Sequence, residues 1–127
     1  MCLYTKQIKP KVAEKDLVVY KVLDYNMGSP YYGLLYPLNR KVTSELLCYD
    51  HVWNPRNQLF NVEEGLHAFT NRLAAHSHAQ CLEYSNGHIQ FVYKAIIPKG
   101  SKYYIGIDND IASDALIVKR KLWLNLF

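Results

Sequence analysis

The chain has 127 residues, 50% of them hydrophobic and 20% charged, which is too apolar and too weakly charged for a disordered chain. Fifteen Lys and Arg against eleven Asp and Glu leave a net charge of +4 without a tight basic run, and this disfavours nucleic-acid binding. We expect a single domain over residues 1–127, long enough to close a core without metals or disulfides.

The N-terminal segment is locally basic, although Glu14 and Asp16 interrupt the run; its lysines are Lys6, Lys9, Lys11 and Lys15. Residues 16–23 then read DLVVYKVL, rich in β-branched and aromatic residues on both alternating faces. This pattern predicts a strand that is covered on both sides. Lys21 is the exception, because it falls on the face of Leu17, Val19 and Leu23.

Glycine and proline break the pattern from Asp24 to Asn61, where only Val42 to Tyr49 is long enough for another short element. Thr70 to Tyr84 predicts the only helix, with Thr70 as N-cap and Asn86-Gly87 as the stop signal. A stripe of small and apolar residues is expected to pack this helix on the sheet: Leu73, Ser77, Cys81 and Tyr84.

Three strands are predicted after the helix: Ile89 to Ile97, Ser101 to Ile107, and Ala115 to about Leu122. Short turns between them favour antiparallel neighbours, and residues 91–107 are expected to form a hairpin turning at Pro98-Lys99-Gly100. Alternation places Tyr103 and Tyr104 on opposite faces; we expect Tyr103 in the core, and Tyr104 either facing a ligand or covering the sheet edge. The predicted fold class is α+β, a mainly antiparallel sheet with one central helix.

The cysteines are Cys2, Cys48 and Cys81, an odd number with no C-x-x-C pair and no signal peptide before them. This pattern predicts free thiols, no internal disulfide and a cytoplasmic location. A membrane role is not expected, because no apolar stretch approaches the roughly 18 residues that span a bilayer.

The histidines do not predict a metal site, because His76 and His78 are two positions apart on the helix and point in different directions. No nucleophile elbow, phosphate-binding loop or dinucleotide fingerprint is present, so hydrolase and nucleotidase activities lack their signatures. A Cys–His nucleophile stays open, since its members need only meet in space. We therefore predict no catalytic residues, no metal and no cofactor.

Three segments carry a resemblance: residues 63–70 (EEGLHAFT), 91–106 (FVYKAIIPKGSKYYIG) and 112–118 (ASDALIV). Together with residues 18–23, they resemble a family of small uncharacterised proteins of gut bacteria and their phages. The layout is similar, more distantly, to mono-ADP-ribosyltransferases, in which an opening strand, an S-T-S segment and a Glu-bearing last strand surround NAD.

The likeness to ADP-ribosyltransferases implies a ligand site with departures from the pattern. The opening Arg position falls near Lys21, the S-T-S segment near Ala68, Phe69 and Thr70, and the catalytic Glu near Asp114. Lysine supplies a point charge where Arg would grip a pyrophosphate with two bonds, and Asp is one methylene shorter than Glu. The resemblance therefore implies a nucleotide cleft without transferase activity.

Two functions follow from these observations. The first is a non-catalytic binding or interaction protein, an accessory protein of a phage or mobile element whose partner is a protein or a small nucleotide. The alternative is a degenerate ADP-ribosyltransferase-like protein that binds NAD or another nucleotide. The candidate ligand-binding residues, expected on one concave surface, are Lys21, His67, Thr70, Tyr104 and Asp114.

Overall fold

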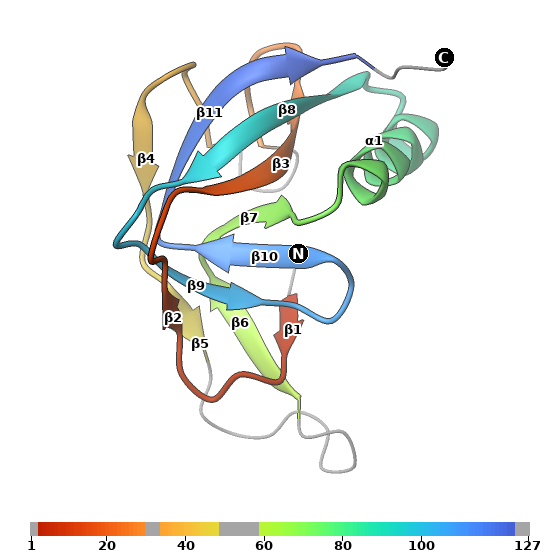
Figure 1. Cartoon of the computed structure of the whole chain (residues 1–127). Helices are drawn as coiled ribbons and strands as arrows, with labels where there is room; N and C mark the ends of the chain where they lie inside the picture. The colour runs from red at the N-terminus through yellow and green to blue at the C-terminus, as the bar shows by residue number, and fades with distance from the viewer. Residues whose placement is uncertain (1–2, 30–33, 49–58, 124–127) are drawn as a thin grey trace.

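Short antiparallel strands and one helix make up the computed structural model, which describes residues 3–29, 34–48 and 59–123 (Figure 1). The predictions at Cys2 and Tyr49 lie outside these residues. The elements are β1 (Leu3–Thr5), β2 (Lys11–Val12), β3 (Leu17–Asp24), β4 (Lys41–Thr43), β5 (Leu47–Cys48), β6 (Phe60–Glu64), β7 (Leu66–Phe69), α1 (Arg72–Asn86), β8 (Gln90–Ile97), β9 (Lys102–Ile105), β10 (Asp110–Ser113) and β11 (Ala115–Leu122). A mostly antiparallel α+β arrangement is confirmed.

The larger sheet has the order β2-β9-β10-β7-β3-β8-β11-β4, and every pair in it is antiparallel. Its two halves meet at β7 and β3, which share a single bridge pair, Tyr20↔Phe69. By contrast, β3 and β8 pair along their whole length, from Leu17↔Ile97 to Asp24↔Gln90. The junction between β3 and β7, here called the seam, is therefore the weakest ladder of the sheet.

The expected hairpin over residues 91–107 is not formed. The strands themselves are present as β8 and β9, but β8 pairs with β3 and β11 whereas β9 pairs with β10 and β2. The turn at Pro98–Gly100 instead carries the chain from one half of the sheet to the other, fixed by the bond from Gly100 N to Ala13 O (2.8 Å). Strands that follow one another in sequence are usually neighbours in a sheet. Here β8 does not pair with β9, because its two edges are occupied by β3 and β11.

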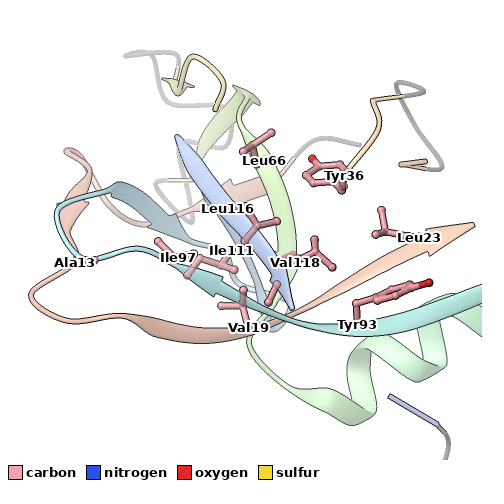
Figure 2. Close-up of a cluster of buried hydrophobic side chains, with 12 residues drawn as sticks. Ala13, Val19, Leu23, Tyr36, Leu66, Tyr93, Ile97, Ile111, Leu116 and Val118 are labelled. Carbon is pink, nitrogen blue, oxygen red and sulfur yellow. The ribbon is translucent and has the colours of Figure 1, made fainter. Parts of the chain in front are cut away.

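One core cluster joins the two halves of the sheet (Figure 2). Leu66, Ala68 and Ile111 enter it from β7 and β10, and Val19 and Leu23 enter from β3. Because both halves contribute side chains to one cluster, burial compensates for the short ladder at the seam.

The helix is confirmed over Arg72–Asn86, but its cap and its buried face differ from the expectation. Asn71, not Thr70, is the N-cap, and its side chain accepts bonds from Leu73 N and Ala74 N. The helix buries Ala75 and Ala79 against Val22 and Val92. The predicted stripe is wrong, since Leu73 is 73% exposed, Tyr84 is 95% exposed and Cys81 is exposed. Alanines let the helix approach the sheet more closely than long side chains would.

A small sheet, β1-β6-β5, was not predicted. It forms a second core in which Leu3 and Val62 pack against Tyr104 and Ala112 of the larger sheet. In place of the one short element expected over residues 42–49, the structure has β4 and β5, and β10 was missed. These segments are too short to show a periodic pattern.

Gly106 makes a close approach between the two sheets. A Cβ at this position would overlap the carboxylate of Asp110 and lie 2.8 Å from Leu3 Cγ, both of which belong to buried residues. We expect Gly106→Ala to lower the free energy of unfolding by about 1–3 kcal/mol, as overpacking does. Urea unfolding measures this, with Gly100→Ala as the matched control, because a Cβ there meets nothing within 4 Å and only the backbone (φ 89°) is strained. Gly100→Ala should lose stability through backbone strain alone, and a loss below about 0.5 kcal/mol in Gly106→Ala would contradict the steric argument.

Candidate functional site

Lys21 lies on the buried face of β3, between Val19 and Leu23, and is 5% exposed. Its Nζ donates to the carbonyl oxygen of His67 at 2.5 Å and lies 4.8 Å from the centre of the Tyr36 ring. The ammonium group thus binds the edge of β7 where the ladder between β3 and β7 stops. No carboxylate among the described residues forms an ion pair with it, and burial lowers the pKa of Lys21 to about 7.

His67 contributes more than its carbonyl group. Within the described residues, both ring nitrogens are buried and have no hydrogen-bond partner. Burial first, and then the charge of Lys21, lower the pKa of His67 to about 4. A buried polar atom without a partner costs on the order of 1–3 kcal/mol, so the ring has unused capacity for a ligand.

The ring of His78 on α1 lies 5.1 Å from that of Phe69, whose side chain is on the same face of β7 as that of His67. Burial and the charge of Lys21 also lower its pKa. The seam therefore brings together one buried lysine and two histidines whose protonation is disfavoured. Such perturbed groups are typical of binding and catalytic sites.

Tyr104, expected to face a ligand or to cover the sheet edge, is 5% exposed and buried, whereas Tyr103, expected in the core, is only partly buried. The small sheet covers Tyr104, and Cys48 lies beside it; burial, and then Cys48, raise the pKa of Tyr104. Ala112 on β10 pairs with Tyr104 on β9 along one edge and with His67 on β7 along the other. They share a face of the sheet two strands apart, roughly 10 Å between backbones.

Thr70 and Asp114 make contacts elsewhere. Thr70 is exposed, and its N–H donates to Asn109 O at 2.9 Å. The Asp114 carboxylate accepts the N–H of Lys102 at 3.0 Å, which fixes the link between β10 and β11. Of the five candidates, Lys21 contacts His67 through a hydrogen bond to its backbone carbonyl. Tyr104 lies on the same face of the sheet as His67, two strands away. Tyr36, which contacts Lys21, was missed because its segment has no periodic pattern.

A surface groove of about 740 Å³ lies apart from these residues, and only its lysines were noted in the sequence. Its walls combine apolar and charged side chains: Lys11, Val12, Glu14, Lys15, Leu17 and Tyr103. The two lysines come from the basic N-terminal segment, and together with Glu14 they leave the lining with a single net positive charge.

No group of three His, Cys, Asp or Glu side chains in the described parts of the chain is placed to hold a metal ion. His76 accepts a bond from Arg72 Nε at 3.3 Å, while His78 turns toward Phe69. The described residues also contain no helix long and apolar enough to cross a membrane.

The chain matches no protein-family model, and searches of curated proteins and of solved structures return no match.

Proposed function

We propose that the chain is a non-catalytic binding protein that holds an anionic group of its ligand at Lys21 and His67. The observation that supports this is a buried ammonium group that has no carboxylate partner among the described residues and donates to the backbone carbonyl of His67, whose ring carries two unpaired nitrogens. Buried charges in proteins are normally paired, since an unpaired charge loses its hydration without compensation. An anion would supply the missing partner.

The proposed binding is coupled to protonation. With its pKa lowered to about 7, Lys21 is mostly neutral at pH 8 in the free protein. An anion beside Nζ favours the charged form and raises the pKa again. Binding should therefore take up protons at pH 8, and the affinity should fall as the pH rises from 7 to 9.

A thermal-shift series at pH 7 tests the proposal with inorganic phosphate, AMP, ADP-ribose and NAD as probes. A probe at 100 times its Kd should stabilise the folded protein by about 2.7 kcal/mol. Lys21→Met should remove the shift while the protein stays folded. Lys102→Met, an exposed lysine on β9, should keep it. The absence of any shift with all four probes, or an unchanged shift in Lys21→Met, would contradict an anion site at Lys21.

The alternative is a degenerate ADP-ribosyltransferase-like protein that binds NAD or another nucleotide. In its favour, Lys21, at the place of the opening Arg, contacts β7, the strand that leads into the helix. Against it, the carboxylate of Asp114 is engaged by Lys102 N. Preference for NAD and ADP-ribose over AMP and phosphate in the same series would favour this alternative. The proposed accessory role in a phage or mobile element rests on the sequence resemblance alone.

A further inference from the structure

The outward face of α1 carries an uncharged stripe. Leu73 is 73% exposed and Tyr84 is 95% exposed, and Ser77 and Gln80 lie exposed between them. The spacing of four, three and four residues places these side chains on one line along the helix. Among the described residues, the opposite side of α1 packs on β3, β7 and β8, and Figure 1 shows the helix at the outside of the sheet.

The charges at the ends of α1 are the reverse of what its own dipole favours. The positive end of a helix dipole is the N-terminus, where acidic residues stabilise, and basic residues stabilise the C-terminus. In α1 the first turn contains Arg72 and no acidic residue, and the last turn contains Glu83 and no basic residue. Both charges would be favourable next to a helix that runs in the opposite direction.

We propose that α1 is the contact surface of a symmetric homodimer, in which the helices of two copies pack antiparallel along the stripe. A twofold axis near the middle of the helix brings Leu73 of each copy against Tyr84 of the other. Ser77 and Gln80 lie at the centre, where their moderate size allows the helices to approach. Such an interface is self-complementary, as a twofold dimer requires.

The charged residues fit the same register. At 100° per residue, Arg72, His76 and Glu83 fall on one flank of the stripe. In an antiparallel pair each flank faces the same flank of the second copy, so Arg72 lies opposite Glu83 of the second copy, twice by symmetry. Arg72 is held on this flank, because it donates to Trp123 O at 2.6 Å and to His76 Nε2 at 3.3 Å. Trp123 is 70% exposed at this end and adds apolar surface.

Charge reversal in sedimentation equilibrium tests the register. The chain should dimerise with a Kd in the range of about 1 µM to 1 mM, since the contact is small. Arg72→Glu and Glu83→Arg should each raise the Kd about tenfold, because both symmetric ion pairs become repulsive. The double reversal should restore the original Kd. Glu14→Arg, an exposed reversal between β2 and β3, is the control and should change nothing.

Removal of the apolar contact tests the surface itself. Leu73→Lys combined with Tyr84→Lys should abolish the dimer without changing the Tm, since both side chains are exposed. Ile8→Lys is the matched control, because Ile8 is 77% exposed and lies outside α1. A chain that stays monomeric at the highest concentration would overturn the proposal and leave the stripe to a different protein. A dimer that survives Leu73→Lys with Tyr84→Lys, or one that the double reversal fails to restore, would overturn it as well.

Discussion

Lys21→Met should stabilise the protein at pH 7 and destabilise it near pH 10. Burial lowers the pKa of Lys21 from 10.5 to about 7. Each pKa unit corresponds to about 1.4 kcal/mol, so the buried charge costs about 4 kcal/mol at pH 7 and below. The methionine also loses the bond to His67 O, which leaves a buried carbonyl unpaired at a cost of about 1–3 kcal/mol. The net gain at pH 7 is about 1–3 kcal/mol.

The pH dependence has a definite sign. Between pH 7 and 10.5 the unfolded chain holds the Lys21 proton and the folded chain does not, so this group makes stability rise with pH. At pH 10 less than about 1 kcal/mol of the charge penalty remains, and the lost bond to His67, at about 1–3 kcal/mol, outweighs it. Urea unfolding from pH 6 to 10 measures the free energy of unfolding of wild type and Lys21→Met. Subtracting one from the other removes the contribution of the other titrating groups. Lys102→Met is the control, and a constant offset between wild type and Lys21→Met would contradict the buried ammonium.

At protein concentrations well below the Kd of the proposed dimer, Leu23→Ala should lower the free energy of unfolding by about 2–5 kcal/mol, whereas Leu73→Ala should change it by less than about 0.5 kcal/mol. Leu23 is fully buried in the cluster that joins the two halves of the sheet, and Leu73 is 73% exposed. The same chemical change is thus compared at two burial states. Equal losses would mean that Leu73 is covered in solution, and a small loss at Leu23 would mean that the cluster repacks around the missing atoms. The spacing of apolar residues in the sequence predicted a core position for Leu73, and its exposure in the structure contradicts that prediction.

The sequence by itself determined the elements with long and regular patterns. The strands near residues 16–23, 89–97 and 115–122 and the helix near residues 70–84 were predicted within a few residues of β3, β8, β11 and α1. Each is long enough for apolar spacing, β-branched composition or a stop signal such as Asn86-Gly87 to outweigh chance. The unusual position of Lys21 on an apolar face was also visible in the sequence.

Only the tertiary structure decided which faces are buried and which strands are neighbours. Tyr104 is covered because β1, β5 and β6 pack on it, and strands of two to five residues leave no periodic signal. The helix turns Ala75 and Ala79 inward because close approach to Val22 and Val92 gains more contact than Leu73 could offer. The meeting of Lys21 with His67 and Tyr36 likewise depends on the seam, where a long-range pairing stops after one bridge. Such contacts between distant residues are set by packing in three dimensions, which local sequence patterns do not encode.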